Sequence, residues 1–156
     1  LGATTLCLMG FQVLLPTSIP VYNRLIEILG GESNLAPPAD QIGFYSQWQL
    51  WFGVLVALLS GTGQFFWWKR IDKNTLLKEL AYPVLITLIV FAILISLTRI
   101  YDPAYLVITL AGVYLIVSNV KVLLSVTKVN ASLSGGALAH IGVGMMLIGV
   151  MFSSGY

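Results

Sequence analysis

Five long apolar stretches dominate this sequence of 156 residues and decide what it can fold into. A helix needs about 20 apolar residues to cross the hydrocarbon core of a membrane, which is about 30 Å thick. Four stretches approach that length and contain at most one charged residue or histidine each, and they cover 48–68, 80–98, 105–126 and 135–152. The first stretch, 1–15, is shorter, and we interpret it as the end of a membrane helix that begins before Leu1.

The low charge content excludes a soluble enzyme domain. Only 9% of the residues are charged, whereas an ordinary soluble domain has about 25%. Within lipid, only helices and closed barrels satisfy every backbone group, and no apolar–polar alternation suggests a barrel. We therefore expect an all-α fold, a polytopic transmembrane bundle of about five membrane helices. The bundle should form a single domain over 1–156, which we interpret as an excerpt of a longer protein.

The connections carry signals of their own. Apolar residues recur at helical spacing in 21–29 and are followed by Gly30-Gly31, which predicts a short external amphipathic helix on the membrane surface. Asp102 followed by Pro103 is a typical start of a helix, here the fourth span. Asp72, Lys73 and Glu79 are expected to form a solvated inner face.

The basic residues predict the orientation. Six of the eight lie on one side of the predicted spans, namely Lys69, Arg70, Lys73, Lys78, Lys121 and Lys128. Arg24 and Arg99 lie on the other side. By the positive-inside rule, the loop 69–78 is cytoplasmic, while the loop 16–47 and the C-terminus at Tyr156 are external. We expect an integral protein of a bacterial inner membrane. The basic residues form no nucleic-acid-binding face, so membrane lipid is an expected partner and nucleic acid is not.

His140 is the one residue that points to chemistry. It is the only histidine and lies within the last span, where an ionisable side chain is a functional candidate by default. Gly136 and Gly144 lie one turn before and after it on the same face. Two glycines would leave a flat clearing in which a planar macrocycle such as haem could reach the imidazole. We interpret His140 as an axial ligand of haem iron, with Gly136 and Gly144 beside the ring.

Two plainer interpretations stay open. His140 could be a neutral side chain that hydrogen-bonds a neighbouring helix. The small residues could serve close helix packing, through a stripe on the adjacent face that contains Gly135, Ala139, Gly142 and Gly149. No catalytic residue is identified: Cys7 is the only cysteine, and there is no C-x-x-C-H motif and no nucleophile with a base.

Several motifs resemble one family. The segment 136–143, Gly-Ala-Leu-Ala-His-Ile-Gly-Val, resembles the last conserved helix of CcmF-type cytochrome c maturation proteins, members of the haem-handling superfamily. Leu14-Leu15-Pro16, Phe44-Tyr45, Leu59-Ser60-Gly61-Thr62-Gly63 and Trp68-Lys69-Arg70 are similar to further motifs of that family, in the same order. The resemblance covers nearly the whole chain, but only the C-terminal portion of the family's protein.

This resemblance implies a haem lyase in cytochrome c biogenesis. Such a protein receives haem from a chaperone and attaches it to the thiols of a C-x-x-C-H motif in apocytochrome c, together with other maturation subunits. It also holds a b-type haem between two helix histidines, of which His140 matches one. The second ligand is then expected outside this chain, which alone should be inactive. The family's tryptophan-rich external motif is absent, and 16–27 lacks the family's external histidine. Alternatives are a b-haem electron-transfer subunit and a structural or transport subunit.

Overall fold

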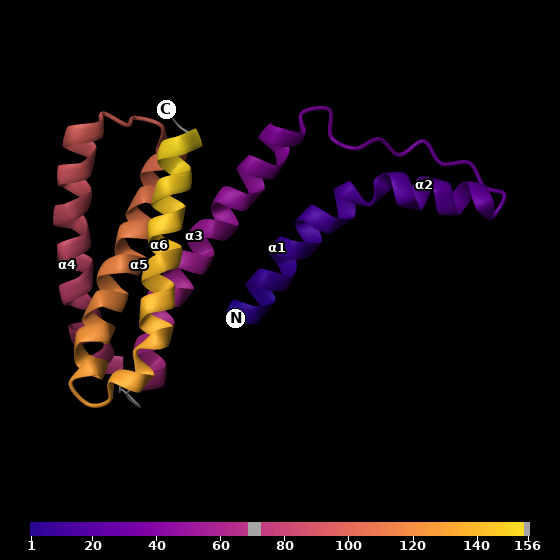
Figure 1. The fold of residues 1–156 in the computed structure, drawn as a ribbon. Coiled ribbons are helices and arrows are strands. Elements are labelled where there is room, and N and C mark those ends of the chain that lie inside the picture. The colour runs from indigo at the N-terminus through magenta and orange to yellow at the C-terminus, as the bar shows by residue number, and fades with distance from the viewer. Residues whose placement is uncertain (69–72, 155–156) are drawn as a thin grey trace. The chain divides into compact units, whose positions relative to one another are not determined.

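A computed structural model describes residues 1–68 and 73–154, and every regular element in them is helical (Figure 1). The elements are α1 (Gly2–Thr17), α2 (Ile19–Ile28), α3 (Gln41–Trp68), α4 (Lys73–Thr98), α5 (Pro103–Thr127), the short 3-10 helix η1 (Ala131–Leu133) and α6 (Gly135–Ser154). Four helices, α3 to α6, are long and apolar enough to cross a membrane, and a fifth span results if the bent pair α1–α2 counts as one. The predicted all-α membrane bundle is confirmed.

Two spans begin earlier than the apolar stretches do. Helix α3 begins at Gln41 rather than at residue 48, because an Asp40 Oδ1 atom accepts a hydrogen bond from the Gly43 amide at 2.9 Å and caps the first turn. Helix α4 begins at Lys73 rather than at residue 80. Lys69, Arg70 and Tyr156, on which much of the predicted orientation rests, lie outside the described residues.

The predicted short helix exists as α2, which is bent by 55° from α1. It ends as expected: Gly30 has a φ of 79°, and the Gly31 amide donates to the Ile26 carbonyl at 2.9 Å. Only glycine adopts such a positive φ without steric cost. Its location on a membrane surface stays a prediction.

The contacts within the chain divide it into two compact units, Leu1–Phe52 and Gly53–Tyr156, where the sequence predicts one domain. In the first unit, α1 and α2 contain no buried residue. Polar side chains supply its long-range bonds, such as the one from Gln49 Nε2 to Gln12 Oε1 at 2.6 Å. Helix α3 starts in this unit and ends in the other.

In the second unit, α5 is the central helix. Within its most apolar window 56% of the residues are buried, against 11% for α4 and 17% for α6. Figure 1 shows α4 and α6 running antiparallel to α5. Asp102 caps α5 as predicted, since its carboxylate accepts from the Ala104 amide at 2.8 Å and Pro103 occupies the first helical position. The second unit is therefore built around α5.

A proline in α4 creates a contact with α5. Pro83 has no amide hydrogen, so the Glu79 carbonyl one turn earlier lacks its helical donor. Lys121 Nζ of α5 donates to that carbonyl at 2.5 Å and pairs with the Glu79 carboxylate at 2.6 Å. The two side chains are only 24% and 31% exposed, for lysine and glutamate respectively. The prediction that Glu79 lies on a solvated face is wrong, because its carboxylate neutralises a lysine inside the bundle.

Candidate functional site

The start of α6 sets the position of His140. Asn130 Oδ1 accepts from the Ser132 amide at 3.0 Å and so begins η1, and the Ser134 carbonyl accepts from the Leu138 amide at 3.0 Å. These bonds begin α6 at Gly135 and place His140 in its second turn. The imidazole is half-buried.

The hydrogen bond of the imidazole assigns its tautomer. His140 Nδ1 lies 2.6 Å from the Gly136 carbonyl oxygen. A carbonyl oxygen can only accept, so Nδ1 carries the proton and the lone pair of a neutral imidazole resides on Nε2. Nε2 makes no hydrogen bond to any described residue. This arrangement is the one metal-binding histidines adopt, with one ring nitrogen donating to a carbonyl and the other left to bind the metal.

Gln64 of α3 is a second polar neighbour, one that sequence reasoning did not identify. Its Nε2 atom lies 3.4 Å from His140 Nδ1. A protonated Nδ1 cannot accept from this amide, and the much shorter contact to Gly136 decides the assignment. The available signal was a glutamine within the apolar stretch 48–68, because polar residues inside a span seek partners on other helices.

The two glycines on either side of His140 have different surroundings. A methyl group added at Gly136 would meet Gln64 Nε2 at 3.5 Å, an ordinary contact distance. At Gly144 it would meet Ile116 Cγ1 at 2.7 Å and the Gly112 carbonyl at 3.2 Å. Gly144 is buried against α5 and does not border open space. The expected clearing beside Gly144 is therefore corrected: its missing side chain admits α5, so the glycine positions the helix that carries His140.

The predicted packing stripe is also corrected. Methyl groups at Gly135, Gly142 and Gly149 would meet nothing within 4 Å. The buried positions of α6 are instead Ala137, Gly144 and Met151, seven residues apart. This face contacts α5, and His140 lies at its edge beside α3.

The donor set suits one axial bond to a metal and no enclosed metal site. The described residues contain no group of three or more His, Cys, Asp or Glu side chains that could hold an ion. Met145 and Met146 are exposed on the same helix as His140 and cannot reach the opposite face of a ring bound to it. A neutral imidazole with a fixed Nδ1 proton fits haem iron as a single ligand.

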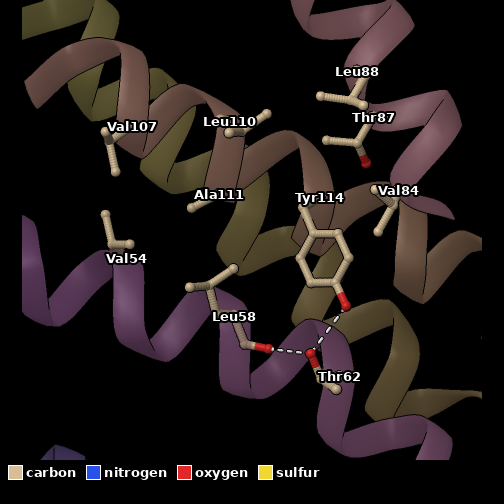
Figure 2. Close-up of a pocket in the computed structure, with 10 residues that line it drawn as sticks. All are labelled: Val54, Leu58, Thr62, Val84, Thr87, Leu88, Val107, Leu110, Ala111 and Tyr114. Carbon is tan, nitrogen blue, oxygen red and sulfur yellow. Dashed lines mark hydrogen bonds between the residues drawn. The ribbon is translucent and has the colours of Figure 1, made fainter. Parts of the chain in front are cut away.

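A separate cavity of about 320 Å³ lies between α3, α4 and α5 (Figure 2). Thr62 donates to the Leu58 carbonyl at 2.7 Å, so the Tyr114 hydroxyl, 2.9 Å away, must be the donor to Thr62. The Thr87 hydroxyl has no partner among the described residues and is sealed behind its neighbours. The cavity therefore offers hydrocarbon contacts and no charged group.

No family model, no curated protein and no solved structure matches this chain. The family stays a prediction that rests on the order of the motifs, while the membrane bundle rests on the helices themselves.

Proposed function

We propose that this chain is the membrane portion of a CcmF-type haem lyase and that His140 supplies one axial ligand of its b-type haem. The order of the motifs supports the family. The geometry of the histidine supports the ligand role. The proposal includes an inner-membrane location with 69–78 cytoplasmic and with 16–47 and the C-terminus external.

The observation that carries the proposal is the 2.6 Å bond from His140 Nδ1 to the Gly136 carbonyl. This bond fixes the orientation of the imidazole and leaves the lone pair of His140 Nε2 available to iron. Gly136 is exposed and places no side chain of its own beside the imidazole, and Gly144 allows α6 to lie close to α5. When bound, haem would supply one-electron chemistry. The residues of this chain would hold and orient the haem, and no described residue pairs a nucleophile with a base.

The remaining components of the reaction come from partners. A lyase of this type acts on apocytochrome c with haem from a chaperone, and other maturation subunits take part. One histidine supplies one axial bond, so we propose that a residue outside this chain supplies the second. The isolated chain is then expected to bind haem in five-coordinate form and to attach none covalently.

Haem titration of the purified chain in detergent tests the ligand role. The original chain should give the absorbance spectrum of a single-histidine complex, and His140→Ala should lose it, with partial recovery on addition of free imidazole. Gly142→Ala is the matched control, since a methyl group there meets nothing. Equal haem binding by His140→Ala and the original chain would overturn the ligand role. A six-coordinate, low-spin spectrum from the isolated chain would contradict the split site.

The same histidine geometry also suits a b-haem electron-transfer subunit, the second candidate. Covalent attachment of haem to a co-expressed apocytochrome c separates the two functions when His140→Ala is placed in the full-length protein. A lyase should lose the covalent product, whereas an electron-transfer subunit leaves its yield unchanged. Absence of any haem from the original protein would favour a structural or transport subunit.

A further inference from the structure

A groove of about 320 Å³ runs between α4 and α5 on the surface of the second unit. Its inner part is apolar and is formed by Ile86 of α4 and by Ile116, Val120 and Leu124 of α5. Its other end is polar, with Tyr82 on α4 and Lys128 at the end of α5. The groove thus has one hydrocarbon half and one half with hydrogen-bond donors.

Among the described residues, the polar half of the groove has more basic than acidic side chains. Lys121 also lines the groove, but Glu79 neutralises it. Lys128 is exposed and forms no ion pair with any described residue. Lys78 is exposed one turn before Tyr82 on the same face of α4 and adds a second positive charge near this end. None of the described residues that line the groove is acidic.

The direction of the helices places this polarity at a membrane boundary. Helix α4 begins, and α5 ends, at the same end of the bundle (Figure 1). Tyr82 and Lys128 therefore lie near the edge of the hydrocarbon layer, while Ile86 and Ile116 lie deeper. An amphiphile with a negative head and an apolar tail has the matching order of groups. Basic pockets between membrane helices on the cytoplasmic side bind anionic lipid headgroups in this way.

We propose that the groove binds an anionic glycerophospholipid. The Lys128 ammonium and the Tyr82 hydroxyl bind its phosphate, and one acyl chain lies along Ile86, Ile116 and Val120. The proposal does not depend on the molecule that His140 binds, and either proposal can fail without the other. The plainer alternative is a lysine that only extends to the membrane surface and interacts with the end of the α5 dipole.

Native mass spectrometry of the detergent-purified chain tests the proposal. Phosphatidylglycerol and phosphatidylcholine with identical acyl chains serve as probes, each titrated separately. One lysine near anionic lipid contributes about 1 kcal/mol, so Lys128→Gln should weaken phosphatidylglycerol retention about five-fold. Lys128→Arg should retain it, and Tyr82→Phe should weaken it less. Phosphatidylcholine has no net charge, so its retention should be weaker and should change less than that of phosphatidylglycerol in all three variants.

Arg99→Gln is the matched control, because Arg99 is an exposed basic residue at the opposite end of α4. It should leave phosphatidylglycerol retention unchanged, and the melting temperatures of all variants should agree. Inorganic phosphate at millimolar concentration should not displace the lipid. Equal retention of both lipids, or phosphatidylglycerol retention by Lys128→Gln equal to that of the original chain, would overturn the proposal. Displacement by inorganic phosphate would also overturn it in favour of a simple phosphate site.

Discussion

The two units of this protein use similar residues in different ways. In Leu1–Phe52, neither the apolar helix α1 nor the amphipathic helix α2 contains a buried residue. Glutamine and asparagine side chains make the long-range hydrogen bonds of this unit. In Gly53–Tyr156, α5 is enclosed by other helices. Helix α1 and helix α5 are both strongly apolar, yet of the two only α5 contains buried residues. Apolar content thus predicts a span and says little about whether lipid or protein surrounds it.

The composition of α5 shows what marks a central helix. Its buried positions include Thr109, Gly112, Ser118 and Asn119. Facing lipid, a polar side chain costs free energy and a small one gains little contact. Between helices, small residues allow close approach and polar residues form hydrogen bonds. The exposed positions of α4 are instead large and apolar, such as Leu88 and Ile93. Small and polar residues are therefore the better guide to helix packing in this bundle.

Of the variants considered, Gly144→Leu should destabilise the second unit most. The new side chain would collide with Ile116 and with the backbone of Gly112, so the second unit should lose about 3 kcal/mol of stability. Gly142→Leu, two residues away in open space, is the control and should cost little. Thermal unfolding of detergent-purified protein compares them. Equal stability of the two variants would contradict the α5–α6 contact.

Loss of the ion pair between Lys121 and Glu79 should cause the second-largest loss of stability. Lys121→Met leaves the Glu79 carboxylate and carbonyl without the lysine in a partly buried position. Removal of one partner from a fully buried pair costs about 3–5 kcal/mol, and partial exposure here should reduce this to about 2 kcal/mol. The double variant Lys121→Met/Glu79→Gln should recover part of the loss in the same unfolding measurement. If the double variant is less stable than Lys121→Met alone, the loss of the ion pair does not explain the destabilisation.

A smaller loss is expected from Tyr114→Phe. This change removes the hydroxyl that donates to Thr62 between α5 and α3. Hydrogen bonds between membrane helices contribute on average about 0.6 kcal/mol, so the melting temperature should fall only slightly. A double-mutant cycle with Thr62→Val measures the coupling directly. Additive effects of the two changes would show that the bond contributes nothing.

The smallest effect should follow Gln12→Leu in the first unit. The variant loses the bond from Gln49, and the second unit should keep its stability within about 0.5 kcal/mol. Hydrogen exchange resolved by segment should change in 1–52 and stay constant in 53–154. Slower or faster exchange in α5 would mean that the two units unfold together.

Helix positions could be predicted from the sequence because span length depends on hydrocarbon thickness. The ends could not, since a cap such as Asp40 extends a helix beyond its apolar part. His140 was identifiable because an ionisable residue in a span is rare. The role of Gly144 was not, because both a clearing and a close contact require a small residue, and only the partner helix distinguishes them. The surroundings of Glu79 were predicted wrongly, because the sequence of α4 does not show that Lys121 of α5 pairs with this carboxylate.

The contact that Pro83 creates also bears on how the chain enters the membrane. A lysine costs about 2.5–3.5 kcal/mol at the centre of a span and less toward its ends, so α5 enters lipid unaided at a penalty. The Glu79 carboxylate and the carbonyl that Pro83 leaves open can receive Lys121 only when α4 is already present. Because α4 precedes α5 in the chain, it is made first. We therefore expect α4 and α5 to insert as a helical hairpin. In a translocon assay, Lys121→Leu should improve insertion of α5 expressed alone far more than insertion of the α4–α5 pair.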